Sequence, residues 1–351
     1  MAATSKNLQN VLIFKLIKIF IFLSLLSCAR EETSRAEFAL GTVCTVTLFE
    51  NGQRTIYNNI FSGLREIEKL MSVNIPVSDV SRVNAAAGKE KVPVSKDVFA
   101  VIERAVFFAE ISGGAFDPTV GPLISLWGIG GDNPRVPSHE EIEKTLVLVN
   151  WRNIELDTET RSIFLKYPGM ALDLGGIAKG YAAGVAAAIV KNSNLERAII
   201  DLGGDIVVFG EKQDKSPWRI GIQNPNPDER RGVYIGVLQI PGKENTQQTI
   251  VTSGVYERFF EKNGRHYHHI FSPWSGYPSE NGLLSVTVIA EASMDADALS
   301  TSVFVLGYER GRRLIENKPG VEAVFVFEDN SVRITPGVDF RLTDRTFRIE
   351  S

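Results

Sequence analysis

The sequence predicts an α+β fold in which helices and strands are mixed. Segments with helical spacing of apolar residues alternate with β-branched segments, and this alternation has no regular βαβ period. The composition of the 351 residues, 44% hydrophobic and 23% charged, is globular and excludes a disordered, collagen-like or coiled-coil protein. Because no internal repeat or linker divides the chain, the length permits either one body or two lobes.

The N-terminal segment resembles an export signal. Three lysines precede the short apolar run IFIFLSLLS, which meets Cys28. The run is shorter than the roughly 20 apolar residues that cross a bilayer. The sequence LLSC at 25–28 resembles a lipoprotein lipobox, in which the cysteine becomes the lipidated first residue. We expect a signal peptide over 1–27, a lipid anchor at Cys28 and a polar tether over 28–37; an ordinary cleaved signal or an uncleaved anchor is the alternative.

Charge and cysteine content exclude two classes of function. The chain has 38 basic and 42 acidic residues, and removal of the signal peptide leaves 35 and 42, a net charge of −7. Such an acidic chain has no basic patch for nucleic-acid phosphates, so we expect no nucleic-acid partner. Cys28 and Cys44 are too few for a disulfide framework or a metal-thiolate site, and Cys44 is expected to be buried and inert.

We place the folded domain at 38–351. The sequence of its first half predicts the following elements, in chain order. The segment 38–49 has the β-branched content of a strand. Apolar residues recur at helical spacing over 60–71 and over 98–109, and Gly113-Gly114 ends the second helix. A helix is expected over 138–146 with Ser138 as its cap, followed by short strands near Ile154 and Ile163.

The second half begins with an alanine-rich segment over 175–192, which predicts a helix. The segments at 198–210, 218–223, 233–240 and 283–290 are rich in β-branched residues and predict strands.

The glycine-rich and proline-rich segment 113–130 is a candidate binding site. Asp117-Pro118 can simply begin a turn. Alternatively, the glycines let the backbone approach a ligand, Phe116 offers a face to a planar ring, and Asp117 accepts hydrogen bonds from it. The segment alone does not decide between these interpretations.

The segment DLGGIAKG at 173–180 is a weak candidate for an anion site. Glycines before a helix expose backbone N–H groups, and Lys179 adds a positive charge. The spacing fits neither a Walker loop nor GxGxxG, and the glycines could serve packing alone. DLGGDIVVFG at 201–210 is likewise no dinucleotide fingerprint, which disfavours a nicotinamide Rossmann domain.

The segment 264–278 holds three of the four histidines of the chain. His266 and His268 would share one face of a strand, whereas His269 faces oppositely. A zinc site would need a further ligand. A proton carrier or a hydrogen-bonding histidine beside a ligand is therefore the favoured interpretation.

Asp297 and Thr301 stand one helical turn apart in MDADALSTSVFVLG at 294–307. Positions i and i+4 share a face, so a carboxylate and a hydroxyl can bind one hard cation, naturally Mg²⁺. In the alternative interpretation Asp297 makes a local hydrogen bond, and its neighbours pack in the core.

Taken together and in this order, these motifs resemble those of the ApbE family, the FAD:protein FMN transferases. The resemblance covers about residues 40 to 307. Its motifs are LGT at 40–42, MSVNIPVSDVSRVN at 71–84, GGAFDPTVGPL at 113–123, DLGGIAKGY at 173–181, LGGD at 202–205, TSGVYERFF at 252–260, HHIFSPWSG at 268–276 and DALSTSVFVLG at 297–307.

The resemblance implies a T-fold-like architecture of mostly antiparallel strands packed with helices. It also implies an exported enzyme that binds FAD and Mg²⁺, moves FMN to a Ser or Thr hydroxyl of an acceptor protein and releases AMP. With the lipobox, this places the protein on the periplasmic side of the inner membrane. The implied metal ligands are Asp297, Thr301 and the carbonyl of Gly176. The implied FAD contacts are Leu40, Asn74, Ala115, Phe116, Asp117, Asp173, Lys179 and Ile270.

Asn74 departs from the resemblance, because many relatives have tyrosine at this place. An amide cannot stack as a ring does, and it can order a water molecule. We therefore expect a wetter pocket in which water competes with the protein hydroxyl. An FAD pyrophosphatase that releases FMN and AMP is accordingly an alternative or additional activity, and a non-catalytic flavin-binding lipoprotein is a further alternative.

His269 is the expected acceptor of the hydroxyl proton, because an unperturbed histidine pKa of about 6.5 suits neutral pH. Asp295 is an alternative base, or a group that supports the site without touching the substrate. Asp297 is the residue on which the metal chemistry is expected to depend.

Overall fold

A long antiparallel sheet forms the centre of the computed structural model, which describes residues 33–50, 54–226, 229–230 and 232–350. Within these residues the sheet has nine strands in the order β1-β2-β6-β7-β10-β13-β14-β15-β17, and only β15 and β17 pair in parallel. The strands are β1 (Ser34–Ala39), β2 (Thr42–Leu48), β6 (Ala198–Leu202), β7 (Ile206–Phe209), β10 (Gln247–Gly254), β13 (Leu283–Ala290), β14 (Glu322–Phe327), β15 (Ser331–Ile334) and β17 (Arg348–Glu350).

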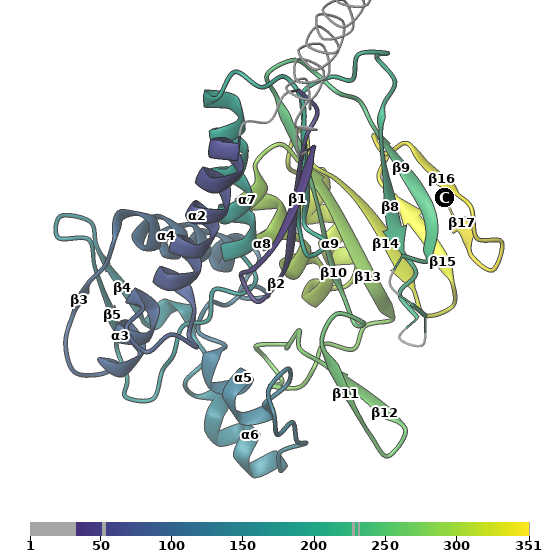
Figure 1. Ribbon diagram of the computed structural model, residues 1–351. Coiled ribbons are helices and arrows are strands. Elements are labelled where there is room, and N and C mark those ends of the chain that lie inside the picture. The colour runs from purple at the N-terminus through teal and green to yellow at the C-terminus, as the bar shows by residue number, and fades with distance from the viewer. Residues whose placement is uncertain (1–32, 51–53, 227–228, 231, 351) are drawn as a thin grey trace, which may run out of the picture.

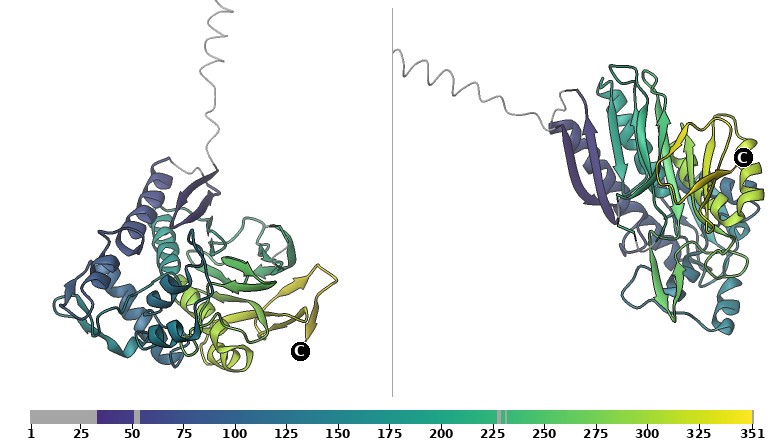
Figure 2. Two further views of the ribbon diagram at one scale, coloured as in Figure 1. Left: turned by 90° about the horizontal axis from the view of Figure 1, so that it is seen from below. Right: turned by 90° about the vertical axis from the view of Figure 1, so that its right-hand side faces the viewer.

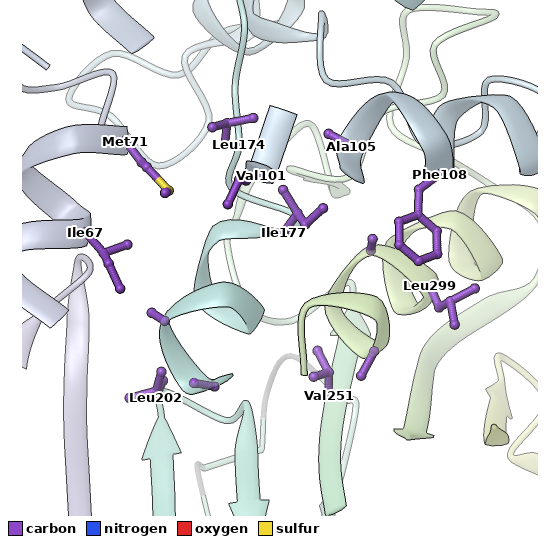
Figure 3. Packing of buried hydrophobic residues seen from close by; sticks show 14 of the residues in the cluster. Ile67, Met71, Val101, Ala105, Phe108, Leu174, Ile177, Leu202, Val251 and Leu299 are labelled. Carbon is purple, nitrogen blue, oxygen red and sulfur yellow. The ribbon is translucent and has the colours of Figure 1, made fainter. Parts of the chain in front are cut away.

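Helices cover one face of this sheet (Figure 1). They are α2 (Arg54–Met71), α4 (Lys96–Ile111), α7 (Ala178–Asn192), α8 (Ser293–Leu306) and α9 (Tyr308–Glu316). In β2, Cys44, Val46 and Leu48 alternate toward this helical face and are fully buried. Figure 3 shows Val101 and Phe108 of α4, Leu299 of α8 and Leu202 of β6 in this common core.

A second, small sheet packs on the opposite face of the long sheet. Its order is β16-β9-β8, with β8 (Trp218–Gln223), β9 (Tyr234–Ile240) and β16 (Phe340–Leu342). Apolar residues of β8 and β9, such as Ile220 and Leu238, pack against Val208, Ile250 and Val324 of the long sheet. The described chain therefore has three layers: helices, long sheet and small sheet (Figure 2).

The remaining elements lie to the left of the helices and below the end of the sheet in Figure 1. They are α3 (Asp79–Ala85), α5 (Gly121–Trp127), α6 (His139–Leu146) and the 3-10 turn Trp151–Asn153, with the strands β3 (Val92–Pro93), β4 (Ile154–Asp157), β5 (Ser162–Leu165), β11 (Phe259–Lys262) and β12 (Arg265–His268). Trp127, Ile142 and Phe271 join α5, α6 and the segment after β12 in a separate small core.

The structure confirms the predicted α+β class with mostly antiparallel strands. Ser138 caps α6 in a full capping box with Glu141, as its sequence predicts. The helix expected over 175–192 begins at Ala178, so Gly175 and Gly176 precede it.

The prediction of a single strand over 38–49 is wrong, because a hairpin turn divides this segment between β1 and β2. Leu40 and Gly41 form the turn with φ of +55° and +70°, the left-handed pair that a two-residue hairpin requires. β1 also begins at Ser34, so 34–37 belong to the sheet and not to the expected tether. The expected signal peptide and Cys28 lie outside the described residues.

No helix in the described part of the chain is both long and apolar enough to cross a membrane.

Candidate functional site

A pocket of about 980 Å³ lies where the helices meet the turns of the long sheet. This volume is at the upper end of the range for small-molecule sites. The predicted site residues all line this pocket: Leu40, Asn74, Ala115, Phe116, Asp117, Asp173, Gly176, Lys179, His269, Ile270, Asp297 and Thr301. Asp295, the alternative base, does not line it. Arg104 binds the Asp295 carboxylate with two hydrogen bonds, which explains why that expectation is wrong.

Asp297 is a buried carboxylate at the inner end of the pocket, with 3% of its surface exposed. The N–H of Gly180 donates to Asp297 Oδ2 over 2.8 Å. Burial, and next the charge of Asp205, raise the pKa of Asp297 to about 7, although Lys179 and the Gly180 hydrogen bond act in the opposite direction. A cation beside Asp297 would therefore relieve a charge that the fold leaves poorly compensated.

Thr301 lies one turn further along α8, as predicted, and Gly176 lies against it. A Cβ atom on Gly176 would come within 3.1 Å of Thr301 Oγ1 and 3.2 Å of Phe116 Cε2. The buried side chains of Leu174 and Ile177 hold the glycine turn on both sides, and Figure 3 shows both pointing into the core. The close approach therefore favours glycine at 176, because a Cβ atom would fit only if Thr301 and Phe116 moved by a few tenths of an ångström.

This donor set suits Mg²⁺ better than a transition metal. Asp297, Thr301 and a backbone carbonyl would supply oxygen only, and Mg²⁺ is held by one or two carboxylates together with substrate phosphates and water. In the described part of the chain no three His, Cys, Asp or Glu side chains converge as a protein-only metal site would need. The zinc alternative at 264–278 thus has no support there.

Lys179 forms an ion pair that the sequence analysis missed. Its Nζ lies 2.5 Å from Oδ2 of Asp205, which is only 1% exposed. Burial alone would lower the pKa of Lys179, but the carboxylates of Asp205 and Asp297 outweigh it and raise this pKa. The ammonium is therefore charged and held in place. The motif LGGD contained the signal, since its aspartate follows two turn-forming glycines.

The segment 115–117 forms the wall beside Gly176. Ala115 and Phe116 are buried, and the Asp117 carboxylate accepts hydrogen bonds from the N–H and Oγ1 of Thr119 and from the N–H of Trp151. Burial raises the pKa of Asp117 against these hydrogen bonds. The structure thus supports both interpretations of this segment: Asp117 holds its own turn together, and the turn lines the pocket.

His269 lies on the pocket wall, and its Nδ1 is 3.2 Å from the carbonyl oxygen of Arg258. If Nδ1 carries the hydrogen and donates to that carbonyl, Nε2 keeps a lone pair that can accept a proton. Burial, and next the nearby Arg258, lower the pKa of His269 to about 3. The expectation of an unperturbed pKa is therefore wrong, and the side chain is neutral at pH 7.

The two other histidines of this segment lie outside the pocket. His268 is buried, accepts from the N–H of Ile270 at Nδ1 and donates from Nε2 to the carbonyl of Ser279. His266 is exposed and stacks on Phe259. His268 therefore anchors the segment, and only His269 is placed for chemistry.

The fold and the site together define a class: an α+β protein with a pocket of about 980 Å³, in which a buried carboxylate and a lysine fixed by an ion pair meet at glycine turns. The sequence profile of the ApbE family matches residues 40–325. The chain therefore belongs to the ApbE family.

Individual relatives agree with this assignment. The chain is 36% identical to the FAD:protein FMN transferase of Treponema pallidum (strain Nichols) over 91% of this chain and 92% of that one. It is 37% identical to one from Klebsiella pneumoniae (strain 342) over 84% and 88%. The solved ApbE protein of Thermotoga maritima superimposes with a TM-score of 0.75 at 36% identity, covering 89% of this chain and 97% of that one. The flavin transferase ApbE of Vibrio cholerae gives 0.73 at 28%, covering 90% and 97%.

Proposed function

We propose that this chain is a Mg²⁺-dependent FAD:protein FMN transferase, which moves FMN from FAD to a Ser or Thr hydroxyl of an exported or membrane acceptor protein and releases AMP. The observation that carries the proposal is the meeting of Asp297, Thr301 and Gly176 beside the Lys179–Asp205 pair in one pocket. The names of the relatives support the same activity.

The acceptor oxygen attacks the phosphorus of the FMN half, and the bond from that phosphorus to the oxygen of the AMP half breaks. The acceptor proton passes to His269 Nε2, and AMP leaves as the phosphate monoester. Asp297, Thr301 and the Gly176 carbonyl would hold Mg²⁺, which would supply positive charge beside the pyrophosphate. Lys179 adds a second fixed positive charge, and Asp205 keeps it oriented.

His269 can perform its step only while it is neutral, and its lowered pKa ensures this at pH 7. A pKa of about 3 makes a weak base in the free chain. The negative pyrophosphate would raise this pKa once FAD lies beside the ring, which makes the proton transfer more favourable in the complex than in the free protein.

FAD pyrophosphatase activity is the second candidate, and Asn74 is the observation that favours it. Asn74 is exposed and lines the pocket from the segment between α2 and α3. A short polar side chain there leaves room for water near the phosphorus. Hydrolysis then differs from transfer only in the attacking oxygen. A non-catalytic flavin carrier would give no use to the buried Asp297.

For localisation we propose a bacterial lipoprotein anchored at Cys28 on the periplasmic side of the inner membrane. The support is the lipobox-like sequence at 25–28. Labelling of cells with a radioactive fatty acid would mark the wild-type chain and not Cys28→Ala. Equal labelling of both would contradict the anchor.

The experiment that tests the main proposal combines the chain from residue 29, FAD, Mg²⁺ and a candidate acceptor protein. AMP release and covalent flavin fluorescence on the acceptor are followed together. The proposal expects AMP and covalent flavin in equal amounts. AMP without covalent flavin favours the pyrophosphatase. The absence of both products would exclude both activities.

A further inference from the structure

The pocket continues onto the face of the long sheet that the helices do not cover. Val43 and Thr45 of β2 and Asp201 of β6 line it, together with Arg219 and Gly221 of β8. In β2 the neighbouring Cys44 and Val46 point to the helical core, so Val43 and Thr45 point to the opposite face. The cavity therefore passes around the turns at 40–41 and 203–204, from Asp297 on the helical side to β8 on the other side.

β8 presents an unpaired strand edge at this end of the pocket. It is the last strand in the order β16-β9-β8 of the described small sheet. In β9, Gln239 N–H donates to Asp339, and the Ile235 carbonyl accepts from Thr343, so odd-numbered residues of β9 bond toward β16. Even-numbered residues of β9 therefore bond to β8.

The register then decides which groups of β8 remain available. The even-numbered residues of β8, Trp218, Ile220 and Ile222, pair with even-numbered residues of β9. Because successive residues of an antiparallel strand bond to opposite sides, the backbone N–H and C=O of Arg219 and Gly221 point away from β9. Arg219 and Gly221 also line the pocket, and a strand edge with outward backbone groups can bind extended polypeptide.

An exposed apolar pair lies on the face of the long sheet that is opposite the helices, the same face on which the small sheet packs. Phe38 of β1 and Val43 of β2 are direct cross-strand partners, and they are 72% and 59% exposed. Apolar residues of the small sheet pack against residues of β6, β7, β10, β13, β14 and β15, and neither Phe38 nor Val43 belongs to that cluster. A contact between the rings of Phe49 and Trp218, 5.4 Å apart, joins the end of β2 to the start of β8. Val43 lines the same pocket as Arg219 and Gly221 of β8, and Phe38 adjoins Val43. We call the part of the pocket between Val43 and β8 the groove.

We infer that the acceptor polypeptide binds in this groove as an extended segment, which pairs with the β8 edge at Arg219 and Gly221 and rests an apolar side chain on Phe38 and Val43. The inference rests on the proposed function, since the acceptor must reach the same cavity that holds FAD. Backbone pairing would hold the segment at a fixed height above the pocket and so present its hydroxyl to the phosphorus. The acceptor is the occupant because the groove opens directly into the site of the reaction.

The test uses the full mature chain. The acceptor is the protein that becomes covalently fluorescent when it is co-expressed with the wild-type chain. For the test it is purified in unmodified form from cells that lack the chain. Arg219→Pro removes the edge N–H, whereas Arg219→Ala keeps it and removes the side chain. Phe38→Ser removes half of the apolar pair. Val147→Ser is the matched control, because Val147 is also 72% exposed but does not line the pocket.

We expect Arg219→Pro and Phe38→Ser to raise the acceptor KM at least tenfold. Phe38 does not line the pocket, so Phe38→Ser should leave kcat and FAD affinity within twofold of wild type. Val147→Ser should stay within threefold in acceptor KM, and the acceptor KM of Arg219→Ala should be at least threefold below that of Arg219→Pro. Unmodified acceptor should also slow amide hydrogen exchange at Arg219 and Gly221. If Arg219→Pro does not fold, the acceptor KM of Phe38→Ser and the hydrogen-exchange measurement on the wild type still test the inference.

Other results would overturn the inference. An unchanged acceptor KM in both variants does so while leaving the transferase proposal intact. The chain from residue 29 could also bind phosphatidylglycerol vesicles. If Phe38→Ser abolished that binding without changing the acceptor KM, the apolar pair would be assigned to a membrane. Dimerisation that Phe38→Ser abolishes, again with unchanged KM, would assign it to a second copy. If wild-type chain makes no protein covalently fluorescent, the proposed function itself fails, and the inference fails with it.

Discussion

Lys179 Nζ lies 2.5 Å from the buried Asp205 carboxylate, so the positive charge that acts on Asp297 is itself paired with a second carboxylate. Lys179 stands in the first turn of α7 and Asp205 immediately before β7. The pair therefore fixes the helix to the sheet at the pocket and keeps the ammonium in a single position. Positioning and charge both depend on a contact between segments far apart in the sequence.

Removing one member of this pair should destabilise the fold. Asp205→Ala leaves the Lys179 ammonium without its partner in a largely buried place, and such losses cost about 3–5 kcal/mol. The double change Asp205→Ala with Lys179→Met removes both charges and should recover a large part of that loss. Urea unfolding of the wild type and three variants measures the coupling; additive effects would contradict a direct interaction.

Asp297→Asn should abolish FMN transfer, with at least a hundredfold loss of rate, because the neutral amide keeps the shape but not the charge that would hold Mg²⁺. Asp295→Asn is the matched control: it lies on the same helix, but its carboxylate binds Arg104 and does not line the pocket. AMP release at several Mg²⁺ concentrations measures the effect. Full activity of Asp297→Asn would remove the metal assignment.

Gly176→Ala should lower Mg²⁺ and FAD affinity about tenfold or more, because the new Cβ would crowd Thr301 Oγ1 and the Phe116 ring. Gly184→Ala is the control within α7, since its Cβ would meet an ordinary contact at 3.9 Å and alanine favours helix. Quenching of FAD fluorescence with and without Mg²⁺ compares the two. Equal affinities in both variants would show that the turn does not need glycine.

Asn74→Tyr should reduce hydrolysis of FAD in the absence of acceptor, because the ring would displace the water that we expect there. Asn74→Gln keeps the amide and should retain hydrolysis. Release of AMP during long incubation with FAD and Mg²⁺ is the measurement. Hydrolysis that is unchanged by tyrosine, or no hydrolysis by the wild type, would refute this role of Asn74.

Acidification should destabilise the fold through His268. Burial lowers its pKa to about 4, whereas a histidine in the unfolded chain titrates near 6.5. Between these values the unfolded chain binds a proton that the folded chain does not, so the free energy of unfolding falls as pH drops from 6.5 to 4, by up to about 3 kcal/mol. The variant His268→Asn should be less stable than the wild type at pH 7, but its free energy of unfolding should fall less on acidification. Parallel pH dependences of the wild type and His268→Asn would contradict this account.

Local patterns were sufficient for the parts of the site that depend on one element. Asp297 and Thr301 share a face of α8 because their spacing is one helical turn, and Ser138 caps α6 because its sequence contains the full capping box. The glycine turn before α7 also follows from its own sequence. The motifs that resemble the ApbE family brought the other pocket residues together.

Contacts between distant segments were beyond local patterns. The pairing of Lys179 with Asp205 depends on how α7 docks on the sheet, and the lowered pKa of His269 depends on burial by neighbouring segments. Asp295 was a plausible base in sequence, but Arg104 of another helix binds it. The turn at Leu40 was missed because a leucine at φ +55° gives no local signal, although Gly41 beside it does.

Gly180 lets α7 and α8 touch almost backbone to backbone, since a Cβ there would come within 2.4 Å of the Ser293 carbonyl oxygen. The helix that carries Asp297 and Thr301 is thus packed directly against the helix that carries Lys179. A ligand that binds only this assembled state must raise the melting temperature by mass action, and one at a hundred times its Kd adds about 2.7 kcal/mol. Heating curves with a panel of nucleotides would therefore rank what the pocket accepts, without any acceptor protein.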